Sequence, residues 1–429
     1  MLEGSIITIS NHRTIRMIRE SVNSVQGNAR ACVFWEPLFS IPHTMFTGYM
    51  TLYMLELGVT TTQVGLITSL GLIIHIFFAL ISTYITDKLG RRYTTLIFDL
   101  TGWFIPIVIW AAAQDIRYFI VAAIFSASFR VVANSWRCLM LEDSKPESMV
   151  HVFTFLQVAG IIGGFFAPIG ALLINRLTLV PAMRVMLVFS MFSMMALFVI
   201  RHFGVTETAV GRQKMKEMKG VKIRDVFISY IPTLKRIFKE RLLMIVLLLH
   251  ALNFIQLTIR TTFLAVLVTE SMRFPAEAMA VFHIITAIVM LLTLLLIAPL
   301  LSHITRHWPV SMGVGFHIVA IVVLLLSPPS QNYFLLVLGA IFIALGTSIA
   351  TPRIEALLAN TIVNEERSVA NAVMAVIVLV LTVPFGYIGG RLAGIDARLP
   401  FLLTLGILLL SLLLIRVATR LELKANKEG

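Results

Sequence analysis

The stretch "TYITDKLGRR", residues 83–92, places four charged side chains and a glycine between two long apolar segments. Asp87, Lys88, Arg91 and Arg92 are residues that the interior of a bilayer excludes. About twenty mostly apolar residues precede them, enough to cross a bilayer as a helix, and a second apolar run follows directly. The stretch is therefore typical of a short polar loop between two membrane-spanning helices.

The rest of the chain repeats this alternation of apolar segments and charged loops. Of its 429 residues, 58% are hydrophobic and 13% are charged, and the mean hydropathy is +0.91. An average soluble protein has about a quarter of its residues charged. The sequence predicts about twelve spans of about twenty residues each. They cover residues 31–56, 62–86, 93–113, 117–140, 150–175, 183–203, 242–268, 275–301, 309–327, 332–357, 369–390 and 399–419.

The placement of the basic residues predicts the orientation. Most of the 35 Lys and Arg fall in loops on the side of both termini, and the positive-inside rule places that side in the cytoplasm. Residues 1–29 are polar and basic, so no signal peptide is predicted. We therefore expect a multi-pass protein of the cell inner (cytoplasmic) membrane. The net charge of +13 reflects this topology, and we expect no nucleic-acid partner.

The longest polar interruption, residues 204–241, falls near the midpoint of the chain. Its second part alternates apolar and basic residues, which favours a helix lying on the membrane surface against anionic lipid. We interpret the whole segment as a loop that joins two helix bundles. The expected divisions are a cytoplasmic tail over 1–29, a six-helix bundle over 30–203, the linker over 204–241, a second six-helix bundle over 242–419 and a cytoplasmic tail over 420–429.

Weak internal matches support two related bundles. When the chain is displaced by about half its length, "AIF" at 123–125 meets "AIF" at 340–342, and Arg137 meets Arg353. Several such matches in the same order indicate a duplicated six-helix unit. The expected fold is an all-α membrane protein with twelve transmembrane helices in two pseudo-symmetric six-helix bundles.

In this setting the opening stretch resembles a signature of the major facilitator superfamily of secondary transporters. The signature lies between helices 2 and 3 and reads Gly-x-x-x-Asp-Arg/Lys-x-Gly-Arg-Arg/Lys. The matching residues are Asp87, Lys88, Gly90, Arg91 and Arg92. The sequence departs at Thr83, where the family usually has glycine for close helix packing. The resemblance implies that two six-helix halves move a small-molecule substrate by alternating access.

The resemblance also implies a gate on the cytoplasmic side. Asp87 would meet the N-terminus of helix 11, near residues 368–371, because a carboxylate is stabilised at a helix N-terminus. Arg91 and Arg92 would pair with two acids below span 4, and these contacts would latch the halves. The alternative is that the basic residues only set the topology. The expected gating motif comprises Asp87, Lys88, Gly90, Arg91, Arg92, Glu142 and Asp143.

Polar residues recur at helical spacing inside spans 1, 4, 7 and 10. Such residues are costly in a membrane and are candidates for function, and the spacing places each set on one helix face. The resemblance implies that these four helices line a central cavity. The candidate substrate-binding residues are therefore Glu36, Ser40, His43, Thr47, Arg130, Asn134, Asn253, Gln256, Arg260, Thr351 and Glu355.

Two other features of the spans favour helix packing over a site. One is a polar stripe in span 8, formed by His283, Thr286, Met290 and Thr293. The other is "GIIGGFFAPIG", residues 160–170, which resembles a glycine-proline pattern in helix 5 of many family antiporters. Small residues allow helices to approach closely.

Two transport mechanisms remain open. In the first, Glu36 and Asp99 carry the protons that drive export of amphipathic compounds. This mechanism is favoured because Glu36 would also neutralise Arg130. In the second, Arg130 and Arg260 clamp an organic anion, or a sugar-type solute, during uptake or exchange.

A membrane-embedded enzyme or sensor is the alternative class of protein. No HExxH, no GxSxG and no phosphate-binding loop occurs in a suitable context. We therefore expect no enzymatic activity, no cofactor and no metal site. The expected state is a monomer, and the expected partners are the substrate, protons and membrane lipid.

Overall fold

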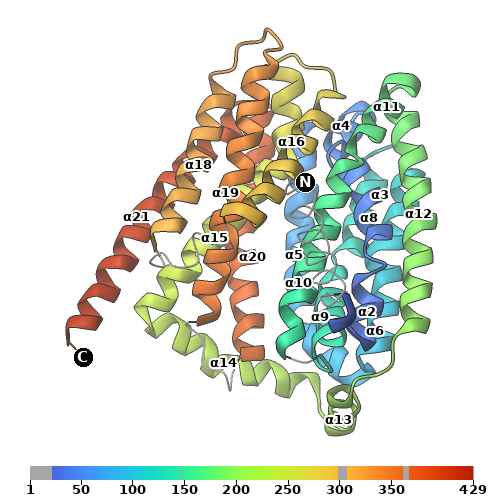
Figure 1. Ribbon diagram of the computed structural model, residues 1–429, viewed down its shortest axis with the longest axis vertical. Coiled ribbons are helices and arrows are strands. Elements are labelled where there is room, and N and C mark those ends of the chain that lie inside the picture. Colours follow the sequence, from blue (N-terminus) through green and yellow to red (C-terminus); the bar gives the residue numbers. More distant parts are fainter. Residues whose placement is uncertain (1–21, 145, 298–306, 361–366, 429) are drawn as a thin grey trace, which may run out of the picture.

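The computed structural model describes residues 22–144, 146–297, 307–360 and 367–428. Within these ranges the chain forms helices and turns and no strand. Figure 1 shows two groups of long helices side by side, joined at one end by two linker helices. The linker helices are α13 (Ala209–Glu217) and α14 (Ile223–Lys239). We call the end of the molecule that carries them the linker side.

The first group contains the helices that precede the linker. Several of its transmembrane segments consist of two or more consecutive helices. The members are α2 (Gly27–Val33), α3 (Pro37–Thr47), α4 (Met50–Glu56), α5 (Thr61–Leu89), α6 (Arg91–Asp99), η1 (Leu100–Phe104), α7 (Ile105–Ala111), α8 (Ile116–Ser126), α9 (Phe129–Leu141), α10 (Pro146–Phe165), α11 (Ala167–Leu177) and α12 (Leu179–Gly204).

The second group follows the linker. Its members are α15 (Arg241–Val266), η2 (Leu267–Ser271), α16 (Ala278–Leu292), η3 (Thr293–Ile297), α18 (His307–Leu325), α19 (Tyr333–Asn360), α20 (Arg367–Ala393) and α21 (Leu399–Glu428). In the described part of the chain, eleven helical segments are long and apolar enough to cross a membrane. They agree closely with eleven of the predicted spans, and the predicted all-α transmembrane fold is confirmed.

The remaining predicted span, 31–56, is divided into three short helices. The first break follows Val33, and α3 then begins at Pro37. Proline suits the first position of a helix, because its fixed φ fits the helix and its missing N–H has no partner there. Glu36 lies at this break as the N-cap residue of α3. The second break includes Gly48, where an added Cβ would lie 2.5 Å from a ring carbon of His283.

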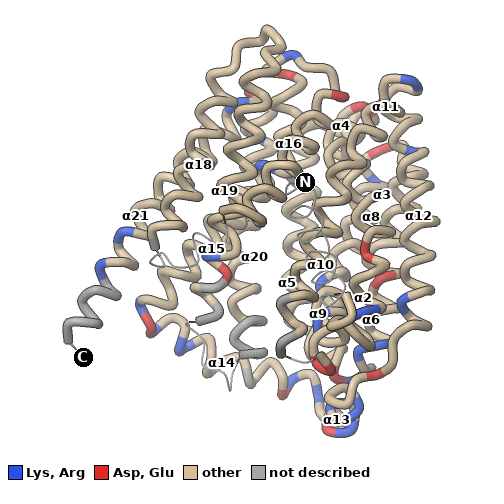
Figure 2. Tube along the Cα trace, viewed as in Figure 1, with Lys and Arg blue, Asp and Glu red and all other residues tan. Residues whose placement is uncertain are grey.

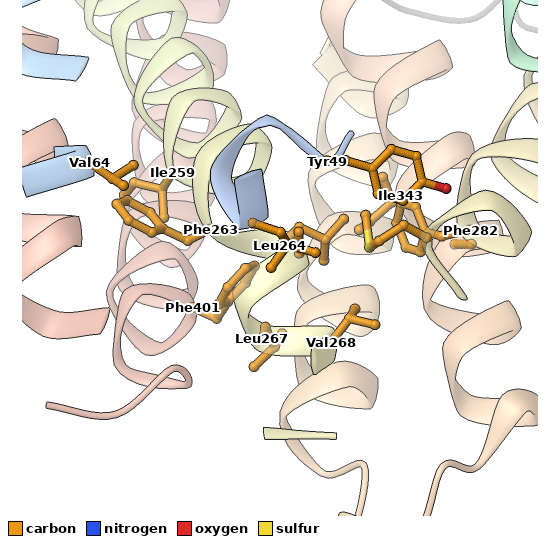
Figure 3. Packing of buried hydrophobic residues seen from close by; sticks show 14 of the residues in the cluster. Tyr49, Val64, Ile259, Phe263, Leu264, Leu267, Val268, Phe282, Ile343 and Phe401 are labelled. Atoms are coloured by element: carbon orange, nitrogen blue, oxygen red, sulfur yellow. The ribbon is translucent and has the colours of Figure 1, made fainter. Parts of the chain in front are cut away.

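A shared hydrophobic core joins the two groups. Tyr49 and Val64 of the first group belong to the same buried cluster as Phe263, Phe282 and Ile343, which come from α15, α16 and α19 (Figure 3). In a membrane such packing stabilises mainly through close van der Waals contact, because lipid tails are as apolar as the side chains.

The most extensive contact between the groups runs along α5 and α20. An added Cβ at Gly65 would lie 2.4 Å from the carbonyl oxygen of Gly386, so the two backbones touch here. One turn further on, the Ser69 hydroxyl donates to the carbonyl oxygen of Val383 at 2.6 Å. Small residues on both helices make this approach possible.

The groups also meet on the side away from the linker. The Thr51 hydroxyl donates to the carbonyl oxygen of Thr262 at 2.7 Å, and α11 packs against α16. An added Cβ at Gly164 would lie 2.6 Å from the Cβ of Ala287. At this position the glycine-rich stretch 160–170 serves close packing between the groups.

Charged residues gather at the linker side, around α13 and the ends of the neighbouring helices (Figure 2). Few charged residues lie between the two ends of the long helices. This distribution is typical of a protein that crosses a membrane. The charges that do lie within the spans are therefore the first candidates for function.

Candidate functional site

A cavity of about 840 Å³ lies between the two groups. Its walls come from α3 and α10 of the first group and from α15, α16, η3 and α19 of the second. Small-molecule sites commonly have about 300–1,000 Å³. The helices α11 and α16 pack together at the end away from the linker, and exposed Glu355 lies toward the linker end of α19. The cavity has the size and position of a solute site.

Arg260 of α15 is the buried cation of this cavity. Its side chain lines the cavity and is 7% exposed. The guanidinium Nη1 donates to the hydroxyl of Thr347 on α19 at 3.2 Å. Among the described residues no carboxylate lies within ion-pair distance of Arg260. A buried guanidinium with a single neutral partner is costly, because burial removes water that the charge would otherwise hold.

A histidine behind the cavity wall fixes the position of Thr347. His317 of α18 is 2% exposed, and its Nε2 lies 3.2 Å from the same hydroxyl that Arg260 contacts. Gly346 makes room for the ring, since an added Cβ would lie 2.6 Å from the His317 Cδ2. Sequence reasoning missed His317, because a lone histidine in an apolar span carries no pattern that names its partner.

Four of the eleven candidate substrate-binding residues line the cavity. They are Thr47, Arg260, Thr351 and Glu355. The span 8 stripe lines it too, although the sequence interpretation assigned this stripe to helix packing. Its members are His283, Thr286, Met290 and Thr293. The signal was present in the sequence, because the stripe has the same helical spacing as the other polar sets.

The other candidates from span 1 lie away from this cavity, inside the first group. The Ser40 hydroxyl donates to the carbonyl oxygen of Ala159 on α10 at 2.8 Å. The His43 ring stacks on Phe39 at 5.1 Å between centroids and meets Trp103 edge-on at 5.5 Å. Both side chains therefore hold α3 against its neighbours in this conformation.

The polar candidates of spans 4 and 7 also make contacts outside the cavity wall. The Asn134 amide donates to the hydroxyl of Thr86 on α5 at 3.4 Å. The Gln256 amide donates to Oδ1 of Asn253 at 3.2 Å, within α15. Their role in binding stays a prediction.

Asp99, Arg201 and Glu36 form a buried cluster within the first group. The Arg201 guanidinium donates to the Asp99 carboxylate, and these residues are 5% and 3% exposed. Glu36 lies within electrostatic range of both. Its Oε2 is buried and has no hydrogen-bond partner in the described part of the chain. The cluster thus holds two carboxyl groups for one guanidinium.

Arg130 is not the partner of Glu36, contrary to the interpretation from sequence. It lies within electrostatic range of His75 and His250, and its guanidinium carbon is 5.4 Å from the centre of the Phe129 ring. The cation that accompanies Glu36 is Arg201. Sequence reasoning missed Arg201, because it lies near a helix end, where a basic residue is ordinary.

The loop motif at 83–92 forms a network on the linker side. The Arg91 guanidinium pairs with Asp87 at 2.9 Å and with Glu142 at 3.0 Å. The expected pair between Arg91 and Glu142 is therefore present, but both residues belong to the first group, so this pair does not itself join the two halves. Arg92 Nε instead donates to the carbonyl oxygen of His202 at 3.1 Å.

The remaining members of the expected gating motif have other neighbours. Asp143 accepts from the backbone N–H of Ala209 at 3.4 Å. Lys88 donates to the hydroxyl of Tyr84 at 2.9 Å. The expected contact of Asp87 with the start of helix 11, near residues 368–371, involves side chains that the structure does not describe.

Glu207, at the start of the linker, completes the network. Its two carboxylate oxygens accept the backbone N–H groups of Arg91 and Arg92, each at 3.0 Å. A carboxylate at this position satisfies free N–H groups and the positive end of the α6 dipole. Gly90 has a φ of +84°, and an added Cβ there would lie 2.5 Å from Glu207 Oε2. This explains the glycine of the motif.

Two groups of spanning helices with a solute-sized cavity between them are the arrangement expected of a membrane transporter. The family model described as the Major Facilitator Superfamily matches residues 38–343. The chain belongs to this superfamily. It is accordingly a transporter and not an enzyme. A comparison with curated proteins found no match.

Solved structures of three transporters illustrate the shared fold. The nucleoside transporter NupG has a TM-score of 0.67 and 13% identity over 92% of this chain and 99% of its own. The D-xylose-proton symporter has a TM-score of 0.71 and 13% identity over 90% and 96%. The human organic anion transporter MFSD10 (TETRAN) has a TM-score of 0.62 and 14% identity over 92% and 99%. At such identities the likeness shows the fold alone.

Proposed function

We propose that this transporter moves a small amphipathic anion and binds its acidic group at Arg260. The observation that carries the proposal is a buried guanidinium that lines the cavity and, among the described residues, has only Thr347 as a hydrogen-bond partner. A bound carboxylate or phosphate would supply the missing counter-charge through charge-assisted hydrogen bonds. Occupation of the cavity by an anion would thus offset part of the cost of burying Arg260.

The apolar part of the proposed solute would lie against the apolar side chains that line the cavity. Met279, Phe282 and Met290 line the cavity from α16, and Leu264 and Ile343 face it from α15 and α19. Methionine adapts its shape to irregular ligands because its unbranched chain has several rotatable bonds. These residues favour an organic anion over a fully polar solute such as a sugar.

A matched set of compounds tests this class of substrate. We expect an organic acid to raise the melting temperature of the purified protein, and its methyl ester and amine analogues to leave it unchanged. Ligand present at about a hundred times its dissociation constant stabilises a protein by about 2.7 kcal/mol. Stabilisation by the amine or by a neutral sugar, without stabilisation by the acid, would contradict the proposal.

We further propose that Glu36 couples transport to protons. It shares Arg201 with Asp99, so one added proton would make the buried cluster neutral. Glu36 directly precedes α3, and α3 contributes Thr44 and Thr47 to the cavity wall. A change in charge at the start of α3 would therefore favour one position of this wall over another. Binding of a proton could shift the conformational equilibrium in this way only if it favours one of the two states.

Glu36→Gln is expected to abolish the dependence of transport on a pH gradient in proteoliposomes. Glutamine has nearly the same shape and cannot take up or release the proton assigned to Glu36. The stabilisation by an organic acid should persist, because Glu36 does not line the cavity. The control is Glu56→Gln, at the exposed end of α4. Gradient-driven transport that survives in the Glu36 variant would refute the coupling.

We also propose that the linker side faces the cytoplasm, in the inner membrane, and that the Arg91 network acts there as a gate. The basic residues around α13 and α14 support this orientation. The network ties the loop after α5 to Glu142 of the first group and to Glu207 of the linker. Arg91 is 3% exposed, so losing one partner of its ion pairs would cost more than the loss of a surface pair, which is worth about 1 kcal/mol or less.

A further inference from the structure

The linker helix α14 has two different apolar faces. One face packs against the second group through Tyr230 and Ile237, which are 7% and 1% exposed. A neighbouring face leaves Ile228, Ile231 and Phe238 exposed by 50%, 49% and 62%. These residues are spaced at three and seven positions, so they share one side of the helix. The described part of the protein packs on the first face and leaves the second uncovered.

Basic residues border this uncovered face. Arg224, Lys235 and Lys239 are exposed, and Lys235 lies one helical turn from Ile231 and from Lys239. Arg236 has a different place, since it pairs with Glu240 at 3.1 Å. The uncovered face therefore combines large apolar side chains with a basic border.

The position of α14 along the chain places this face beside a membrane. Only Glu240 separates the end of α14 from Arg241, where the next membrane-spanning segment begins. The helix therefore lies next to the level at which α15 enters the bilayer. A helix with exposed apolar and basic residues at this level can insert the former among acyl chains and hold lipid phosphates with the latter.

We propose that the uncovered face of α14 is a binding site for anionic lipid headgroups of the membrane that holds the transporter. Ile228, Ile231 and Phe238 enter the boundary between headgroups and acyl chains. Arg224, Lys235 and Lys239 contact the phosphates. The proposal concerns the linker helix alone and does not depend on the identity of the transported solute.

Lipid binding at this face acts on a helix that touches both halves of the protein. The Tyr230 hydroxyl donates to the carbonyl oxygen of Leu80 on α5 at 3.0 Å. Its ring packs in the same cluster as Val373 and Met374 of α20. Burial, with a smaller contribution from nearby Asp87, raises the pKa of the Tyr230 phenol, so the hydroxyl stays protonated and remains a donor. Anionic lipid thus stabilises the arrangement in which α14 bridges the groups.

A spin label on Ile231→Cys tests the proposal in the full-length protein. The protein is reconstituted in nanodiscs of phosphatidylcholine alone, or of an equal mixture with phosphatidylglycerol, and the immersion of the label is measured. Protein without the added cysteine gives the background from Cys32 and Cys138. We expect the label to move from a partly water-accessible position in phosphatidylcholine to an immersed one in the mixture.

Two charge variants in the label background decide whether the basic border is responsible. The change Arg224→Gln, Lys235→Gln and Lys239→Gln should remove the difference between the lipids. The matched control, Lys214→Gln, Lys216→Gln and Lys219→Gln, removes the same charge around α13 and should keep the difference. If both variants lose the difference between the lipids to the same extent, the effect depends on net charge alone and the proposed site is wrong. If the label stays in water in both lipids, the uncovered face does not bind the membrane and the proposal is wrong. A protein partner would then be the alternative occupant of this face.

Discussion

Arg260→Gln is expected to abolish stabilisation of the protein by organic acids and to reduce their binding about thirtyfold or more. The reason is that this buried guanidinium lines the cavity and has no carboxylate partner among the described residues. Loss of one member of a buried charged pair typically costs about 2–5 kcal/mol. Without ligand, the variant should melt at the same temperature as the wild type or higher, because a costly buried charge has been removed.

Arg353→Gln is the matched control for this change. Arg353 also lines the cavity, but it lies six residues beyond Thr347, toward the linker end of α19. We expect the control to keep the preference for acids over esters. If Arg260→Gln binds acids as well as the wild type does, the acidic group lies elsewhere. If Arg260→Gln strongly lowers the melting temperature without ligand, the guanidinium has a structural partner and the proposed site is wrong.

Arg201→Gln is expected to destabilise the folded protein by about 3–5 kcal/mol, the range found when one partner of a buried ion pair is removed. The variant leaves Asp99 and Glu36 without a nearby cation in an interior where Arg201 is 5% exposed. Without ligand, Arg201→Gln should therefore lower the melting temperature, whereas Arg260→Gln should leave it unchanged or raise it. Thermal melting in one detergent, at one pH, compares them directly.

The double variant Asp99→Asn, Arg201→Gln measures the interaction free energy of the ion pair, separately from the contribution of each residue. Because both charges disappear together, it should be more stable than Arg201→Gln alone, with a coupling free energy of about 1–3 kcal/mol. Arg176→Gln, at the exposed end of α11, controls for the loss of a positive charge. Additive effects of the two single changes would mean that the ion pair does not contribute to stability.

Hydropathy predicted the spans well because it depends on a property of each segment alone. A stretch of apolar residues crosses a membrane as a helix whatever its neighbours are. The divided first span shows where this reasoning stops. Pro37 and Gly48 mark both breaks in the sequence, but an average over twenty residues does not register them. The position of Glu36 at a helix start therefore emerged only from the structure.

The pairs that organise the charged residues were harder to predict, because helix packing selects them across long separations. Glu142 was expected beside Arg91, since both lie at the same end of neighbouring helices. Glu207 caps the same motif from the start of the linker, and Arg201 meets Asp99 from another span. No local pattern connects these partners. The sequence interpretation relied on charge balance and paired Glu36 with Arg130, whereas Arg201 is the cation near it.

Periodicity showed which polar residues share a helix face but not which face the cavity receives. Arg260 and Thr351 line it, whereas Asn253 and Gln256 on the same stripe as Arg260 do not. The stripe of span 8 lines it although it was assigned to packing. The rotation of each helix about its axis depends on its neighbours, and a single sequence does not contain that information.

The backbone contact between α5 and α20 limits how the two halves can move. At Gly65 and Gly386 no side chain separates the chains, and the Ser69 hydroxyl binds the opposing backbone. A contact between main chains has no rotamers to rearrange, so it tolerates a small rotation about its own line and resists separation. A motion that opened the cavity to the opposite side would then be a rigid-body rotation of the two halves about the line of this contact. The solute would gain access at one edge as it lost access at the other.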